Sequence, residues 1–207
     1  MNHPFEFNLD KGIEAILYIA QKVDDPTFHR ISKIMYFADR KHLEKYGRFI
    51  CGDSYVAMKH GPVPSEIYDI LKAVRADTVL SLKPYEAAKK VQSAFSVQEP
   101  YEVKHLRESN LDFFSESDLE CLNYSIENYR NLSFDELTEL SHDQAWEAAN
   151  ENDFIEIEQI ARTLNNAEEL ISHLQDQHPG EALWSQSGKY FMCLLAAILN
   201  QRQNLNL

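Results

Sequence analysis

Apolar residues recur at positions i, i+3, i+4 and i+7 within residues 11–22, which predicts an amphipathic helix. A second helix is predicted to begin at Asp25-Pro26. Aspartate can cap free backbone N–H groups, and proline fits the first helical position because it lacks an N–H of its own. Gly47 is the predicted end of this helix, since glycine readily adopts the left-handed conformation that terminates helices.

The pattern becomes extended after this glycine. Two short runs, FIC at 49–51 and YVAM at 55–58, flank the turn-forming sequence GDS and predict two extended segments. Residues 91–107 also alternate without a helical period, which predicts one more hairpin. These pieces are expected to pair into a small antiparallel sheet on a helical body.

The sequence GPVPSE, at 61–66, changes from extended to helical character within a few residues. Its glycine permits backbone angles that other residues resist, and each proline fixes its own φ. Val63 is predicted to be the N-cap of a helix, with Pro64 at the first position and Glu66 at the third. We interpret the stretch as a rigid structural corner, with a binding role as the alternative.

Helical patterns return in the second half of the chain. Ser117–Glu120 and Ser133–Glu136 have the S-x-x-E form of a capping box and predict two helix starts. Further helices are predicted over about residues 155–175 and about residues 183–201. The last one contains an apolar run, residues 190–199, which is interpreted as a core helix or, alternatively, as a helix that covers a partner's groove.

Charge is distributed unevenly along the chain. The net charge is -13, from 20 basic and 33 acidic residues. Residues 99–169 contain 4 Lys/Arg and 19 Asp/Glu, which gives -15, whereas residues 1–98 contain 14 and 12, which gives +2. An acidic middle repels phosphate backbones and favours a basic protein partner. The alternative is a set of solvated helix faces that keep the protein soluble.

No catalytic or metal-binding motif is evident. Cys51, Cys121 and Cys193 are far apart without a CxxC pair, which suits reduced thiols in a cytoplasm. The eight histidines show no metal-ligand spacing and no glycine loop for phosphate is present, so no metal or cofactor is expected. One enzymatic alternative is a nucleophile formed by Cys51 and His60, which nothing in the sequence brings within hydrogen-bonding reach. No signal peptide or membrane-spanning segment is predicted.

Two sequence blocks resemble the signature of the Panacea, or SocA-like, domain family. Residues 31–71, ISKIMYFADRKHLEKYGRFICGDSYVAMKHGPVPSEIYDIL, contain a K-x-x-Y-F-A-D helix followed by the YGR and GPVPS block. Residues 140–146, LSHDQAW, match the second hallmark, L-S-H-x-x-x-A-W. The signature residues, which we expect to be structural, are Tyr36, Asp39, Tyr46, Gly47, Gly52, Asp53, Tyr55, Lys59, Gly61, Pro62, Val63, Pro64, Ser65, Tyr68, Ser141, His142 and Trp146.

The resemblance implies a cytoplasmic antitoxin of a bacterial or phage toxin–antitoxin pair, which neutralises its cognate toxin by direct protein–protein binding. It implies no enzymatic activity and no cofactor, and the toxin is expected to be encoded beside the antitoxin. The alternative that the family offers is an adaptor that delivers a toxin or other client to an AAA+ protease. Some relatives carry a helix-turn-helix domain that this chain lacks, so direct DNA binding is not expected, and neither is membrane binding.

The predicted fold class is therefore α+β and predominantly α-helical: a single compact domain with a small antiparallel sheet and a helical C-terminal extension. Residues 1–150 are assigned to the Panacea domain, and residues 151–207 to the extension packed on it, with a toxin-specific role. Aromatic anchors beside an apolar helix are typical of interface hot spots. The predicted partner-binding residues are Trp184, Tyr190, Phe191, Leu194 and Leu195.

Overall fold

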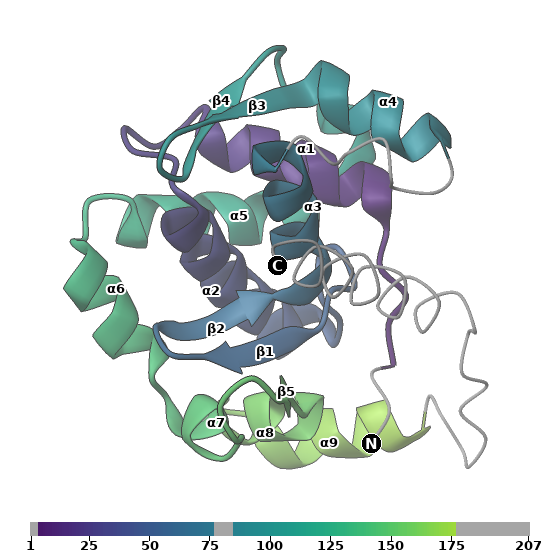
Figure 1. Cartoon of the computed structure of the whole chain (residues 1–207). Coiled ribbons are helices and arrows are strands. Elements are labelled where there is room, and N and C mark those ends of the chain that lie inside the picture. The colour runs from purple at the N-terminus through teal and green to yellow at the C-terminus, as the bar shows by residue number, and fades with distance from the viewer. Residues whose placement is uncertain (1–3, 77–84, 177–207) are drawn as a thin grey trace, which may run out of the picture. The chain divides into compact units, whose positions relative to one another are not determined.

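Helices dominate the residues that this computed structural model describes, 4–76 and 85–176 (Figure 1). The elements in chain order are α1 (Leu9–Ala20), α2 (Phe28–Tyr46), β1 (Tyr55–Met58), β2 (Gly61–Pro64), α3 (Ser65–Arg75), α4 (Tyr85–Ala94), β3 (Phe95–Gln98), β4 (Glu102–His105), the 3-10 helix η2 (Leu111–Phe113), α5 (Glu116–Tyr129), α6 (Phe134–Ser141), α7 (Gln144–Glu147), β5 (Phe154–Ile155), α8 (Ile157–Arg162) and α9 (Ala167–Asp176). The predicted class, a mainly helical α+β protein, is confirmed. Within the described ranges, no helix is long and apolar enough to cross a membrane.

The first two helices follow the sequence pattern with one shift. The predicted helix over 11–22 is α1, and α2 ends at Gly47, whose φ of 70° is left-handed as expected. The start of α2 was predicted two residues too early, because Thr27 is the N-cap and accepts a hydrogen bond from the Arg30 backbone N–H. Asp25 instead accepts a hydrogen bond from the Arg30 side chain at 2.9 Å.

A three-stranded antiparallel sheet has the order β2-β1-β5, and β3 and β4 form a separate hairpin. The strand predicted at 55–58 is therefore confirmed, whereas residues 49–51 form no strand. The hairpin predicted within 91–107 is present, but residues 91–94 belong to α4. The β2 strand lies at an edge of its sheet and carries prolines at positions 62 and 64.

The predicted corner is itself a strand, and its helix begins one residue later than expected. Pro64, not Val63, is the N-cap of α3, and it offers no side-chain acceptor to the helix. Asp53 supplies that acceptor from the turn before β1: its carboxylate accepts hydrogen bonds from the backbone N–H groups of Glu66 and Ile67, both at 3.0 Å. The first turn of α3 is thus satisfied by a residue more than ten positions away in the sequence.

In the second half of the chain, one predicted capping box is confirmed, and the other begins two residues earlier than predicted. Ser133 and Glu136 form the predicted box at the start of α6. For α5 the box is formed by Ser115 and Asp118, not by the predicted pair that starts at Ser117. Asp118 is the better partner because its carboxylate reaches back to the Ser115 backbone N–H at 2.9 Å.

The single helix predicted over 155–175 is wrong, because β5, α8 and α9 share this range. Polar side chains between α8 and α9 bond to backbone carbonyls and so compete with helix continuation. Thr163 donates its hydroxyl proton to the Ile160 carbonyl at 2.7 Å, and the Asn166 amide donates to the Glu44 carbonyl at 3.0 Å. The helix predicted over 183–201 lies outside the described residues.

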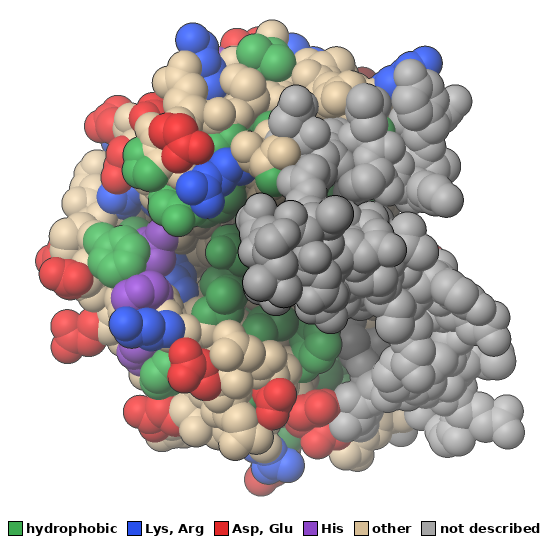
Figure 2. Space-filling view, viewed as in Figure 1, with side chains coloured by type: hydrophobic (Ala, Val, Ile, Leu, Met, Phe, Trp, Pro, Cys, Tyr) green, Lys and Arg blue, Asp and Glu red, His purple; other side chains and the backbone are tan. Residues whose placement is uncertain are grey.

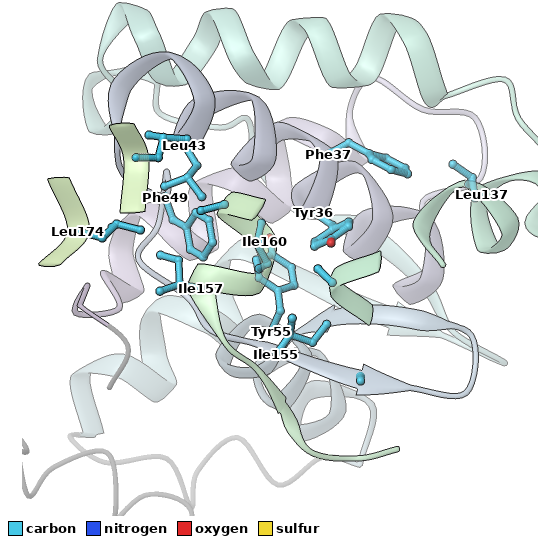
Figure 3. Close-up of a cluster of buried hydrophobic side chains, with 14 residues drawn as sticks. Tyr36, Phe37, Leu43, Phe49, Tyr55, Leu137, Ile155, Ile157, Ile160 and Leu174 are labelled. Carbon is cyan, nitrogen blue, oxygen red and sulfur yellow. The ribbon is translucent and has the colours of Figure 1, made fainter. Parts of the chain in front are cut away.

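The hydrophobic cluster in Figure 3 connects the sheet with α2 and with the helices that follow β5. The helix α2 contacts α1, α3, α5, α6, α8 and β2, so it is central to the described fold. Described residues after position 150 belong to the same cluster as the signature tyrosines of α2 and β1. The buried members are Tyr36, Phe37, Leu43, Phe49, Tyr55, Ala57, Leu137, Ala145, Ile155, Ile157, Ile160, Ala161, Leu170 and Leu174.

Candidate partner-binding site

Two signature aspartates form buried polar centres under the hairpin. Asp39 accepts hydrogen bonds from the Tyr55 hydroxyl and the Ile50 backbone N–H, both at 2.7 Å. Burial raises the pKa of Asp39 to about 6, against the opposing effect of these two bonds. Burial likewise raises the pKa of Asp53 to about 8, opposed by its hydrogen bonds to the start of α3. Both carboxylates fix backbone geometry and are shielded from solvent.

Tyr36 and Asp143 join the two signature blocks. The Tyr36 hydroxyl donates to the Asp143 carboxylate at 2.8 Å, and Arg40 forms an ion pair with the same carboxylate at 3.1 Å. Asp143 also caps α7, because its other oxygen accepts a hydrogen bond from the Ala145 backbone N–H at 3.0 Å. The start of α7 is therefore tied to the middle of α2.

The blocks also meet at Gly61, which has a left-handed φ of 95°. A Cβ atom on this glycine would lie 2.4 Å from Ser141 Oγ, 2.6 Å from Lys33 Nζ and 3.2 Å from His142 Cδ2. Lys33 is fully buried, and its Nζ donates to the Pro62 carbonyl at 3.0 Å. Burial lowers the pKa of Lys33 to about 7.

Histidine and aromatic rings contact one another near this lysine. The ring centroids of His29 and Phe134 are 3.9 Å apart, and those of His60 and Phe134 are 5.2 Å apart. The rings of His142 and Trp146 are parallel within 3°, with centroids 3.7 Å apart. We call these five residues the histidine–aromatic patch. Figure 2 shows histidine side chains gathered beside α6 and the tip of the β1–β2 hairpin, next to apolar and basic side chains.

Two histidines of the patch are held in the neutral form, chiefly by burial. Burial lowers the pKa of His29 to about 3, with further lowering from Lys33, His60 and Arg30. Burial also lowers the pKa of His142, again with contributions from Lys33 and His60, while Glu147 and Asp143 act in the opposite direction. The Nε2 atom of His142 is buried and has no hydrogen-bond partner among the described residues.

An open depression of about 370 Å³ adjoins the patch at Trp146. The Trp146 indole N–H donates to the Met58 carbonyl at 3.0 Å, which fixes the ring against β1. The depression has a volume suited to a few side chains and combines apolar, basic and acidic groups. Its lining residues are Ala57, Lys59, Trp146, Glu147, Ala149 and Glu151.

Several signature residues lie away from the patch. Gly52 has a φ of 72°, and a Cβ there would lie 2.3 Å from the Glu6 carbonyl oxygen, so this position also requires glycine. The Tyr46 hydroxyl donates to Glu120 at 2.5 Å on the surface. The Tyr68 ring meets Phe28 edge-on, with centroids 6.2 Å apart. The backbone N–H of Ser65, the last signature position before Tyr68, donates to the Ser54 carbonyl at 2.8 Å and extends the hairpin ladder.

The structure does not bring Cys51 and His60 into one environment. Cys51 is fully buried, and burial, followed by the nearby charges of Asp39 and Asp53, raises the pKa of its thiol. His60 is exposed at the hairpin tip and contacts Phe134 instead. Among the described residues, no group of three or more His, Cys, Asp or Glu side chains could hold a metal ion.

The five predicted partner-binding residues between 184 and 195 lie outside the described residues. The site residues predicted from the sequence did not include Lys33, His29 or Phe134. A signal was available, because His29 and Lys33 are four positions apart and so lie on one face of α2.

The described fold is a helix-rich α+β domain in which two separate sequence blocks close around one buried lysine. The chain belongs to the Panacea family: the family model of the antitoxin SocA-like Panacea domain matches residues 31–147. The resemblance noted in the sequence is thereby confirmed. Comparison with curated proteins and with solved structures returned no match.

Proposed function

We propose that this chain is the antitoxin of a bacterial or phage toxin–antitoxin system and neutralises its cognate toxin by direct protein–protein binding in the cytoplasm. The observation that carries the proposal is the match of residues 31–147 to the antitoxin SocA-like Panacea domain. The domain acts as a binding partner without catalysis of its own. The toxin is expected to be encoded next to this chain.

The described surface offers suitable material for such a contact. Phe134 and Leu140 on α6 are 46% and 51% exposed. Trp146, which follows a few residues later in α7, lines the depression. Exposed aromatic and aliphatic side chains on a rigid frame are typical anchors of protein interfaces. Because hydrogen bonds hold the start of α7 to α2 and the Trp146 ring to β1, Trp146 needs little ordering when it binds.

The test is coexpression of this chain with the product of the neighbouring reading frame. We expect that product to arrest growth when expressed alone, and this chain to restore growth and to copurify with the product in a defined ratio. The copurified complex should remain intact through gel filtration. A chain that restores growth without any detectable complex would contradict neutralisation by binding.

The same experiment in cells that lack individual AAA+ proteases distinguishes a direct antitoxin from the alternative, an adaptor for a protease. A direct antitoxin protects these cells as well as it protects the parent strain. An adaptor protects only when the protease is present, and the toxin then accumulates in the deletion strain. Protection that disappears in a protease deletion strain would replace the proposed function with the adaptor function.

A further inference from the structure

The depression beside Trp146 combines an apolar floor with a charged rim. Its floor is formed by buried or half-buried residues of β1 and of the α7 region: Ala57, Trp146 and Ala149. Its rim consists of exposed side chains from the hairpin tip and from the α7 region: Lys59, Glu147 and Glu151. An apolar floor with charges at the rim suits a long side chain that has methylene groups and a charged end.

The Trp146 ring is fixed before any partner arrives. One of its faces is stacked on His142, with ring centroids 3.7 Å apart, and its indole N–H donates to the Met58 carbonyl at 3.0 Å. The ring therefore needs no rearrangement in order to line the depression. The face of an indole ring attracts a cation, and a planar guanidinium can stack on it.

The chain around the depression is strongly acidic. Residues 143–158 contain six Asp and Glu residues and no Lys or Arg. Within ranges 4–76 and 85–176, no ion pair includes Glu147, Glu151 or Lys59, so the lysine does not neutralise either glutamate by direct contact. Burial lowers the pKa of His142, so this ring adds little positive charge near neutral pH. The lining has two carboxylates for one ammonium, and its surplus charge is therefore negative.

We propose that this depression binds an arginine side chain of the protein partner, with the guanidinium against the Trp146 ring and the carboxylates of Glu147 and Glu151. The methylene groups of the arginine pack on Ala57 and Ala149. Arginine fits better than lysine, because its planar fork stacks on an aromatic ring while it donates several hydrogen bonds to carboxylates. Tryptophan and arginine are both enriched in interface hot spots. This inference rests on the proposed function, because the partner is the toxin.

Lys59 is the opposing group at the same rim. Its ammonium repels a bound cation, and the contacts with the Trp146 ring and the two carboxylates outweigh that repulsion. The acidic residues of the surrounding range 143–158 act in the same direction as the two carboxylates. The charges therefore predict effects of opposite sign: loss of the glutamates weakens the site, and loss of Lys59 strengthens it. A site for an acidic side chain would show the reverse order.

The site is tested on the full chain with two probes of nearly the same shape, N-acetyl-arginine amide and N-acetyl-citrulline amide. Citrulline has a neutral urea group where arginine has its guanidinium. The indole N–H resonance of Trp146 is followed by NMR at constant ionic strength and is assigned by its loss in Trp146→Phe. We expect the arginine probe to shift this resonance saturably and the citrulline probe to leave it unchanged. Equal shifts with the two probes would overturn the inference.

Variants of the rim test the sign of each charge. The double variant Glu147→Gln, Glu151→Gln should bind the arginine probe at least about tenfold more weakly, and Lys59→Met should bind it more tightly. The matched control Glu168→Gln, Glu169→Gln removes the same charge from exposed positions on α9 and should bind the probe as the parent does. All five positions are exposed, so folding is expected to be retained and is checked by circular dichroism. Equal probe binding by the two double variants would contradict a role for the rim carboxylates and overturn the inference.

The occupant is tested with the toxin from the neighbouring reading frame. We expect the Glu147→Gln, Glu151→Gln variant to bind that toxin at least about tenfold more weakly than the Glu168→Gln, Glu169→Gln variant does. The comparison corrects for lost long-range attraction, because both variants lose the same charge. Equal toxin affinity for the two variants would overturn the arginine contact while leaving the antitoxin function intact. A parent chain that binds no toxin overturns the proposed function, and the probe titrations alone then decide whether the arginine site exists.

Discussion

The ammonium nitrogen of Lys33 lies 2.6 Å from the place where a Cβ atom on Gly61 would be. The two residues come from the two parts of the first signature block, and the left-handed φ of 95° at Gly61 allows the close approach. Ser141 from the second block lies on the same side, 2.4 Å from that place. A glycine is required here for space as well as for backbone conformation.

Substitution of Gly61 by alanine should therefore destabilise the fold by roughly 2–4 kcal/mol, because strain in the backbone adds to a steric clash. The measurement is chemical denaturation of the purified chain. Gly47→Ala is the matched control, since Gly47 has a left-handed φ of 70° but the three atoms nearest to a Cβ there belong to the His173 ring, the closest at 2.9 Å. Gly47→Ala should lower the free energy of unfolding by about 1 kcal/mol. Equal losses in the two variants would show that the contact with Lys33 and Ser141 is unimportant.

Replacement of Lys33 by methionine should raise stability most at neutral and acidic pH. The pKa of Lys33 is about 7 in the folded chain and about 10.5 when unfolded, so the unfolded state binds more protons between these values. The cost of burying the ammonium is complete below pH 7 and fades as the pH rises to 10.5. We expect the free energy of unfolding to rise by roughly 2–4 kcal/mol at pH 7 and to change little near pH 10.5. These values allow for the lost hydrogen bond from Lys33 to the Pro62 carbonyl.

The measurement for Lys33→Met is urea denaturation across this pH range. Lys104→Met, which removes an exposed lysine from β4, controls for the added apolar side chain and should give a small effect that does not change with pH. A Lys33→Met variant that is less stable than the parent at every pH would show that the ammonium has a compensating partner.

Asp118 should be the main acid-sensitive group of the N-terminal packing. Its buried carboxylate bonds to Lys11 at 2.7 Å and Arg48 at 3.0 Å and lies 3.2 Å from His42. Burial alone would raise the pKa of Asp118, but the bonds from His42 and Lys11 outweigh it and hold that pKa well below its ordinary range. Its stabilisation is therefore present above the ordinary carboxyl pKa and is lost as the pH falls.

Asp118→Asn should cost about 3–5 kcal/mol at pH 7, because Lys11 and Arg48 then lack their shared anion. Denaturation at pH 7 and at about pH 3 provides the measurement, and the loss should shrink at the lower value. Asp112→Asn, an exposed acid in η2, should change stability by less than about 0.5 kcal/mol. A loss independent of pH would indicate that shape rather than charge matters at Asp118.

Salt should slow association with the toxin. If residues 99–169 attract a basic partner, the association rate falls markedly as ionic strength rises, since the Debye length shrinks from about 10 Å at 0.1 M to about 3 Å at 1 M. The dissociation rate should change much less, because packed contacts determine it. Stopped-flow or surface-binding kinetics at several salt concentrations measure both. An association rate that ignores salt would leave those acidic residues a role in solubility only.

A chain that ends at Gln177 should fold and melt cooperatively, since Met1–Gln177 is one compact unit that contains the hydrophobic cluster of α2, β1, α8 and α9. We expect it to bind the toxin more weakly than the full chain, because the proposed contact residues Trp184, Tyr190, Phe191, Leu194 and Leu195 are removed while the histidine–aromatic patch remains. Circular dichroism, a melting curve and toxin copurification test both parts. Insoluble or molten protein would assign the removed residues to the core instead.

Features of the fold that depend on neighbouring residues could be predicted from the sequence. The helix α1, the stop at Gly47 and the box of Ser133 with Glu136 each arise from contacts within one or two helical turns. The displaced box at Ser115 shows the limit of such signals, because Ser115 and Ser117 have nearly the same local pattern. Asp118 decides between them through its long-range partners Lys11 and Arg48.

The candidate site could not be predicted in the same way. Tyr36 and Asp143 are 107 positions apart, and the hydrogen bond between them exists only in the folded chain. Lys33 gave no sign of its burial, because a single lysine between apolar residues normally extends its amine to solvent. The strand β5 is too short to show a period, and it is defined by its pairing with Tyr55 and Val56.

The prolines of β2 have a consequence for how this protein behaves at high concentration. Ser65 donates its N–H toward β1, so the alternate residues Pro64 and Pro62 face the free edge, where neither has an N–H to offer. The Pro62 carbonyl at that edge is already occupied by Lys33. A second chain therefore finds no backbone ladder to extend at the β2 edge, and this edge is closed to strand pairing between copies of the protein.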